Sequence, residues 1–170
     1  MASKAVPTPQ ETSFVMKKSA AMKWNKDGQP LRCMIVDDSI YARKNLRFVI
    51  ETFGGHVEGE AADGLAAVTE YDRVKPDIVL MDIIMPKMGG IDAAEIILQR
   101  NPQARIVMVS SVGNQVDILA ALRCGARHFV HKPVKPEALY SAIQQVLEEG
   151  GTLISVAGTK SSARRKDESA

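Results

Sequence analysis

The chain has 170 residues, enough for one well-buried domain and too few for two ordinary ones. Apolar residues make up 45% and charged residues 25%, the usage of soluble globular proteins, which argues against global disorder and against a membrane-spanning class. The net charge of +2, from 22 basic and 20 acidic side chains, argues against a dominant nucleic-acid-binding field.

The two cysteines, Cys33 and Cys124, stand among apolar or small residues and have neither a CxxC nor a Cys/His spacing. We therefore expect buried, reduced thiols and a reducing compartment. The N-terminal residues contain no continuous apolar run of the secretory type, and no segment is long and apolar enough to span a bilayer. These features predict a cytoplasmic protein without a membrane partner.

The predicted elements begin after residues 1–30, which lack sustained periodicity and contain prolines, lysines and serines. This composition predicts an N-terminal extension, flexible or lightly docked on the domain. From Leu31 onward, short apolar runs alternate with segments of helical period, the pattern of an α/β domain with a parallel sheet. The expected strands are 32–36, 56–60, 77–81, 105–109 and 127–131, and the expected helices are 39–53, 64–74, 90–100, 114–124 and 135–149.

Two of the expected strands contain the nearly continuous apolar runs IVLM and IVMV, as in sheets whose two faces are both covered by helices. Ser39 is a suitable N-cap for the first helix, and Gly54 and Gly125 are suitable residues to end helices. The predicted domain is therefore 31–150. Residues 151–170 are expected to form a short C-terminal tail, with 152–156 as a candidate for one extra strand.

Polar side chains follow several of these strands, at the edge where open α/β sheets bind ligands. They are Asp37, Asp38, Asp82, Ser110 and Lys132. A single acidic residue after a strand is usually a helix cap or a turn former. Three carboxylates at one edge repel one another, however, and are tolerable chiefly around a cation. Because oxygen ligands with open positions for water suit Mg²⁺, the cluster predicts a magnesium site.

Four motifs occur in a specific order along the chain: MIVDDS, VLMDIIMPKMGG, VMVSS and FVHKP. Through them, residues 31–149 resemble the receiver domain of two-component response regulators, most closely stand-alone chemotaxis regulators of the CheY type. The resemblance implies a flavodoxin-like, doubly wound, five-stranded parallel sheet with helices on both faces. It also implies the strand order 2-1-3-4-5, for which CheY is itself a known example, and a cis peptide bond before Pro133.

The resemblance also assigns roles at the strand ends. Asp82 would be the phosphoacceptor, its carboxylate attacking the phosphorus of a phosphohistidine on a partner kinase. Asp38 and Asp82 would bind Mg²⁺ directly, together with the backbone carbonyl of Ile84, while Asp37 would act mostly through metal-bound water. Lys132 would direct its compact charge at a phosphoryl oxygen.

A conformational switch is implied as well. Ser110 would donate its hydroxyl to the phosphoryl group, and Phe129 would fill the space that the serine vacates. The output surface would comprise the helix 114–124, the strand 127–131 and the helix 135–149. Phe129 replaces the tyrosine of many chemotaxis regulators, so its switching would rest on packing alone. Simple core packing is the alternative interpretation of Phe129.

Ile84 and Val112 are apolar where some fast-cycling receivers carry polar groups, which predicts slow loss of the phosphoryl group. The resemblance thus predicts a single-domain response regulator of a two-component phosphorelay that is not an enzyme in the usual sense. A histidine kinase would phosphorylate it, and it would bind a target such as a flagellar switch component in chemotaxis or motility. It would be a monomer or a phosphorylation-dependent dimer.

Two other functions remain open from the sequence. One is a receiver of a non-chemotaxis phosphorelay or transcription-control pathway that acts through a separate output protein; no helix-turn-helix pattern follows Glu149, so direct DNA binding is not expected. The other is a phosphatase with an aspartate nucleophile. That chemistry normally needs a second carboxylate close after the nucleophile, and Ile83 and Ile84 occupy those positions.

Overall fold

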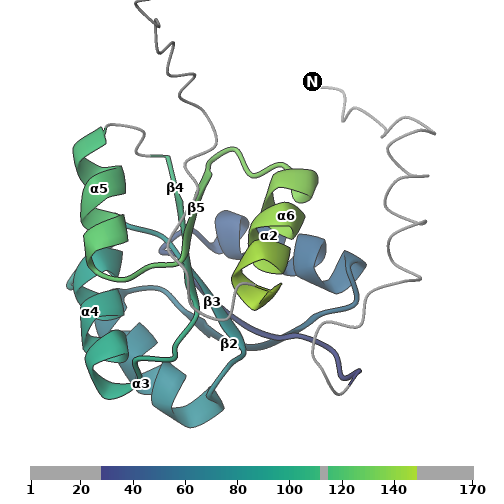
Figure 1. The fold of residues 1–170 in the computed structure, drawn as a ribbon, viewed down its shortest axis with the longest axis horizontal. Coiled ribbons are helices and arrows are strands. Elements are labelled where there is room, and N and C mark those ends of the chain that lie inside the picture. The colour runs from purple at the N-terminus through teal and green to yellow at the C-terminus, as the bar shows by residue number, and fades with distance from the viewer. Residues whose placement is uncertain (1–27, 112–114, 149–170) are drawn as a thin grey trace, which may run out of the picture.

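The computed structural model describes residues 28–111 and 115–148, in which strands and helices alternate along the chain (Figure 1). The predicted extension up to residue 27 and the predicted tail, with its candidate strand 152–156, lie outside the described residues. The strands are β1 (Arg32–Val36), β2 (His56–Ala61), β3 (Ile78–Met81), β4 (Ile106–Ser110) and β5 (His128–His131). The helices are α2 (Ile40–Thr52), α3 (Gly64–Val74), α4 (Gly90–Arg100), α5 (Gln115–Arg123) and α6 (Pro136–Glu148).

The sheet is parallel throughout and has the order β2-β1-β3-β4-β5, which confirms the predicted topology. No end of a described element differs from its expected position by more than one residue, which is the usual scatter of helix and strand boundaries. The order of the strands reverses between β1 and β3. Ligand sites in doubly wound sheets lie at such a reversal, beyond the carboxyl ends of the strands.

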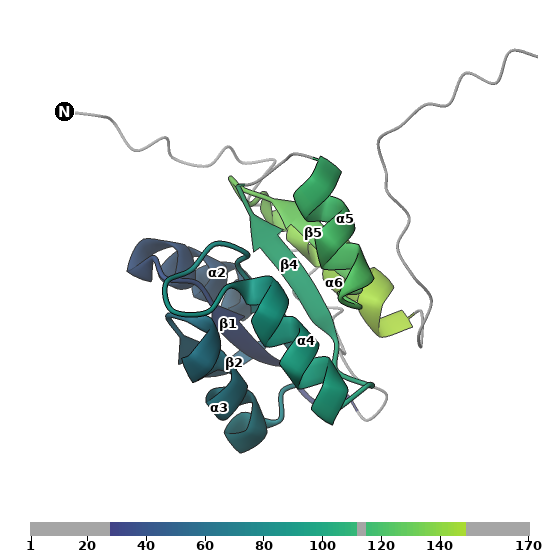
Figure 2. The same ribbon diagram turned by 90° about the vertical axis from the view of Figure 1, so that its left-hand side faces the viewer.

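Helices cover both faces of the sheet, as the apolar strands require. Helices α2 and α6 lie on one face, and α3, α4 and α5 lie on the other (Figures 1 and 2). The pleat of a strand sends alternate side chains to opposite faces, so Cys33 and Ile35 of β1 join the core under α2 and α6. Met34 and Val36 join the core under the other three helices. The sheet is therefore shielded on both sides, and its strand ends are left to bind ligands.

Local signals account for the ends of several helices. The Ser39 hydroxyl accepts a hydrogen bond from the Ala42 amide at 3.3 Å and caps α2, as predicted. Gly54, at φ 83°, and Gly125, at φ 97°, adopt the left-handed conformation after α2 and α5. The peptide bond between Lys132 and Pro133 is cis, as the resemblance implied.

Both cysteines are free thiols, but only one has the buried position that we expected. Cys33 is fully buried in β1, and this burial raises the pKa of its thiol. Cys124 is only half-buried, because it follows the last residue of α5, where the chain turns at the surface. In the part of the chain that the structure describes, no helix combines the length and the apolar character needed to cross a lipid bilayer.

Candidate functional site

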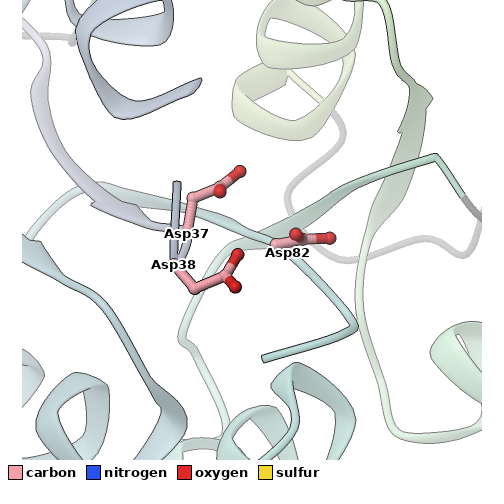
Figure 3. Close-up of side chains that lie close together, drawn as sticks. All are labelled: Asp37, Asp38 and Asp82. Atoms are coloured by element: carbon pink, nitrogen blue, oxygen red, sulfur yellow. The ribbon is translucent and has the colours of Figure 1, made fainter. Parts of the chain in front are cut away.

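The carboxylates lie at the carboxyl ends of the adjacent strands β1 and β3. Val36 pairs with Met81 at the end of this ladder, and the Asp82 amide donates to the Val36 carbonyl at 2.8 Å. The residues that follow each strand are therefore neighbours. Oxygen atoms of Asp37, Asp38 and Asp82 all lie within 4.8 Å of one another, with the three side chains grouped at one edge of the sheet (Figure 3).

Asp37 is completely buried and is held from two sides. Its Oδ1 accepts a hydrogen bond from the Ser39 amide at 2.9 Å, and its Oδ2 accepts one from Lys132 Nζ at 2.6 Å. A buried carboxylate must be paired in this way, because its burial without a partner is costly. Asp38, by contrast, is exposed. The two adjacent aspartates therefore differ in environment: one is fixed inside the protein, and the other faces the open side of the cluster.

Asp82 is 7% exposed and also has two partners. The amide of Ile83 donates to its Oδ1 at 2.7 Å, and Lys132 Nζ donates to its Oδ2 at 3.0 Å. A carboxylate can accept about four hydrogen bonds or metal contacts. Asp82 therefore has a fixed orientation and retains acceptor capacity for a metal ion or an incoming group.

Lys132 reaches the cluster from the end of β5, across β4. Its side chain is 22% exposed and forms ion pairs with Asp37 and Asp82. Burial by itself lowers the pKa of this ammonium group, but the hydrogen bonds to the two carboxylates outweigh burial and raise the pKa above its ordinary value. Lys132 therefore stays charged and offsets part of the negative charge.

The charge and chemistry of this donor set fit a magnesium ion. Three aspartates beside one lysine have a formal net charge of −2, which a divalent cation would neutralise. The donors are all oxygen atoms without sulfur or imidazole, which is the preference of Mg²⁺, Ca²⁺ and Mn²⁺. An exposed member such as Asp38 leaves room for the waters that Mg²⁺ retains.

The expected switch residues flank this cluster. Ser110 is the last residue of β4, is buried, and is paired in the sheet with His131, next to Lys132. Phe129 lies on β5, pairs with Met108, and is half-buried against the core under α3, α4 and α5. It also lines a pocket of about 370 Å³ at β5 and the start of α6. Phe129 thus stands between the core and an open space.

Ile84 lies in segment 82–89, which connects β3 to α4. Its side chain is 65% exposed, two residues after Asp82, so an apolar group stands in solvent beside the site. The Lys87 ammonium donates to Asp63 Oδ2 at 2.7 Å and ties this segment to the start of α3. Hydrogen bonds, first from the Ala66 amide and then from Lys87, hold the pKa of Asp63 below its usual value.

The sequence predictions missed four charged residues that brace this edge. Arg43 donates a hydrogen bond to the Asp37 backbone carbonyl, and Glu60 accepts one from Arg43. The ion pair between Asp63 and Lys87 holds the segment after β3 against the start of α3. An arginine near the start of the helix that follows Asp-Asp was an available signal. The partner of this arginine, Glu60, is 17 residues away in strand β2, so the sequence spacing did not reveal their contact.

Comparison with known proteins gives one consistent result. The family model of the response regulator receiver domain matches residues 33–144. The chain is 42% identical over 115 residues to the chemotaxis protein CheY of Thermotoga maritima, an alignment that covers 68% of this chain and 96% of that protein. It is 39% identical over 116 residues to CheY of Bacillus subtilis, with 68% and 97% of the two chains covered.

Solved structures agree with the sequence comparison. A chain in the CheX–CheY–BeF3–Mg²⁺ complex from Borrelia burgdorferi matches with a TM-score of 0.71 and 33% identity, covering 76% of this chain and 97% of that chain. The response regulator domain of Thermotoga maritima CheB matches with a TM-score of 0.65 and 34% identity, covering 70% and 97%. The fold and the sequence therefore point to the same group of proteins.

Proposed function

The chain belongs to the response regulator receiver domain family, and from this premise we propose that Asp82 is the residue that accepts a phosphoryl group from a histidine kinase. As a CheY-like receiver domain, the protein acts in phosphorelay signalling. The observation that carries the assignment is the position of Asp82: among the three clustered aspartates, it is the one that directly follows the central strand β3. Like Asp37, it also pairs with Lys132.

In the proposed reaction, a carboxylate oxygen of Asp82 attacks the phosphorus of a phosphohistidine. An O–P bond forms as the P–N bond breaks, and the product is an acyl phosphate. The Ile83 amide orients the attacking carboxylate through its contact with Oδ1. Lys132, which lies 3.0 Å from Oδ2, moves its hydrogen bond to a phosphoryl oxygen and offsets the added charge.

Asp38 and Asp82, with the backbone carbonyl of Ile84, would hold the Mg²⁺ ion, and Asp37 would support it through bound water. When bound, Mg²⁺ neutralises charge on the transferring phosphoryl group. The chain's own contribution is to hold Asp37 rigidly between the Ser39 amide and Lys132. This keeps a buried negative charge at the edge of the cluster without allowing the side chain to rotate away.

The output would begin at Ser110, which turns its hydroxyl toward the new phosphoryl oxygens. Phe129 then moves between the pocket beside β5 and the core, and the surface formed by α5, β5 and α6 changes. Its target would be a protein such as a flagellar switch component or a CheX-like protein, in chemotaxis or motility. If a fluorine label on Phe129 reports the same environment with and without BeF3 and Mg²⁺, this switch is wrong.

Incubation of the chain with Mg²⁺ and acetyl phosphate tests the phosphoacceptor directly. We expect intact mass spectrometry to show one labile phosphoryl group, and we expect Asp82→Ala to abolish it. The matched control is Asp92→Ala, which removes an exposed aspartate from the first turn of the neighbouring helix α4 and should label normally. Undiminished labelling of Asp82→Ala would show that another residue is the acceptor.

A further inference from the structure

The main chain that carries Asp37 and Asp38 leaves the sheet at the end of β1. The Asp37 amide still donates to the Ala61 carbonyl of β2 at 3.1 Å, but beyond this point the ladder ends. Backbone carbonyls in a partly buried turn need a donor. Arg43, in the second turn of α2, supplies one: its Nη1 donates to the Asp37 carbonyl at 2.7 Å and lies 3.5 Å from the Asp38 carbonyl.

The Arg43 guanidinium is itself held in place. Its Nε donates to Glu60 Oε2 at 3.1 Å, and only 16% of its side chain is exposed. Glu60 belongs to β2 and immediately precedes Ala61, the residue that accepts from the Asp37 amide. The end of β2 therefore holds the Asp37 main chain in two ways. Ala61 accepts a hydrogen bond from the Asp37 amide, and Glu60 positions Arg43, which donates to the Asp37 carbonyl.

We propose that Arg43 is a positioning residue of the metal site: it fixes the peptide planes of Asp37 and Asp38, and so sets where their carboxylates lie. This inference rests on the proposed function of the aspartate cluster. Arg43 makes its contacts with main-chain oxygens and with Glu60, so it acts through the two aspartates.

Backbone positioning should matter for Mg²⁺ binding because the coordination geometry of this ion is narrowly defined. Mg²⁺ requires nearly ideal octahedral geometry with ligand distances of about 2.0–2.1 Å, so small rotations of a ligand's backbone reduce affinity. Residues that orient metal ligands typically change metal affinity by about 10- to 100-fold when they are replaced. A charged donor on a carbonyl is stronger than a neutral one, which suits a guanidinium for this position.

The chain offers a matched control one helical turn later. Arg47 binds the same carboxylate as Arg43, with Nη2 at 2.7 Å from Glu60 Oε1, and it also pairs with Glu51. The contacts described for Arg47 include neither aspartate carbonyl. Arg43→Gln and Arg47→Gln therefore both weaken the link between α2 and β2, but only the first removes the donor from the aspartate main chain.

Titration calorimetry of the unphosphorylated full chain with MgCl2 distinguishes the two roles. We expect Arg43→Gln to weaken Mg²⁺ binding by about tenfold and Arg47→Gln to change it by less than about twofold. Thermal unfolding of each variant, followed by circular dichroism, shows whether both remain folded at the titration temperature. Arg43→Lys, which keeps a charged donor but lacks the fork that also binds Glu60, should fall between wild type and Arg43→Gln.

Two results would overturn the inference. If the Arg43→Gln and Arg47→Gln variants bind Mg²⁺ equally well, Arg43 only stabilises the fold. If wild type itself does not bind Mg²⁺, the proposed function fails first and the inference fails with it. The wild-type titration therefore separates failure of the site from failure of Arg43.

Discussion

Gly90 is the residue whose replacement should disturb the site most without touching a charged group. It begins α4, and its amide donates to the Ile83 carbonyl at 2.8 Å. A Cβ atom added at Gly90 would lie 1.8 Å from the backbone oxygen of Asp82 and 3.0 Å from Met81 Cγ. The start of α4 therefore packs directly against the main chain of Asp82, the proposed phosphoacceptor, and only a glycine fits there.

The size of the effect follows from this distance. Apart from atoms of its own and adjacent residues, a real Cβ atom essentially never has a heavy atom within 3.0 Å, so Gly90→Ala must separate α4 from Asp82 by at least 1.2 Å, the difference between 3.0 and 1.8 Å. Overpacking typically costs about 1–3 kcal/mol, and a backbone neighbour favours the upper end. The higher helix propensity of alanine offsets about 0.5–1 kcal/mol of this loss of stability. We expect a net loss of about 2 kcal/mol, or about 8 °C in Tm.

Gly89→Ala is the control, because it changes the preceding residue of the same helix end. There the added Cβ would meet the Ile83 carbonyl at 3.2 Å, so the loss should stay below about 1 kcal/mol. Thermal unfolding measures both losses, and acetyl phosphate labelling measures the consequence for Asp82. Gly90→Ala should slow labelling by at least about tenfold, since misplacement of a reacting group by about 1 Å is that costly. Equal stability and equal labelling of the two variants would refute the steric argument.

Two further predictions concern the surroundings of the site. Ile84→Asn should accelerate loss of the acyl phosphate by up to about tenfold, because an amide beside Asp82 can orient a water that an exposed isoleucine excludes; an unchanged decay rate of the phosphorylated protein would show that this side chain does not control water. Asp63→Asn should lower the free energy of unfolding at pH 7, by removing the charge paired with Lys87. The folded-state pKa of Asp63 is lowered, so its contribution is present above about pH 4 and is lost as the pH falls through the folded pKa. The urea-unfolding difference from wild type should therefore shrink between pH 4 and pH 2, and a constant difference would contradict the assigned ion pair.

The fold could be predicted from the sequence because its signals are local. Strands such as Ile78–Met81 are continuous apolar runs, and α2 carries its buried residues Leu46, Val49 and Ile50 at helical spacing. Each of these patterns describes one element by itself. The order of the strands was supplied by the resemblance, since periodicity does not say which strands are neighbours. The helix end beside Cys124 was predicted to within one residue, but Cys124 was placed too deep because its apolar and small neighbours did not show that the chain leaves it partly exposed there.

The clustering of Asp37, Asp38 and Asp82 could also be anticipated, because these residues directly follow strands. Parallel strands deliver such residues to one edge whatever their sequence separation. The roles of the site residues all remain predictions. They are the phosphoacceptor role of Asp82, the metal ligands Asp37, Asp38 and the Ile84 carbonyl, and the roles of Lys132, Ser110 and Phe129. Val112, the second apolar residue used to predict slow dephosphorylation, lies outside the described residues.

Arg43 had a signal in the sequence, but the contacts of the bracing residues could not be anticipated, because they depend on the register of an edge strand. Strand β2 contributes none of the predicted site residues, yet its end and the turn that follows it support both acidic segments. Glu60 of β2 holds Arg43 beside the end of β1, and Asp63, the N-cap of α3, holds Lys87 after β3. The register between β1 and β2 shifts between Cys33 and Met34, so counting residues along the strands would have placed Glu60 wrongly. An edge strand can therefore support the proposed metal site without supplying a ligand. Glu60 should be replaced alongside the aspartates, because it holds Arg43, which donates to the Asp37 main chain.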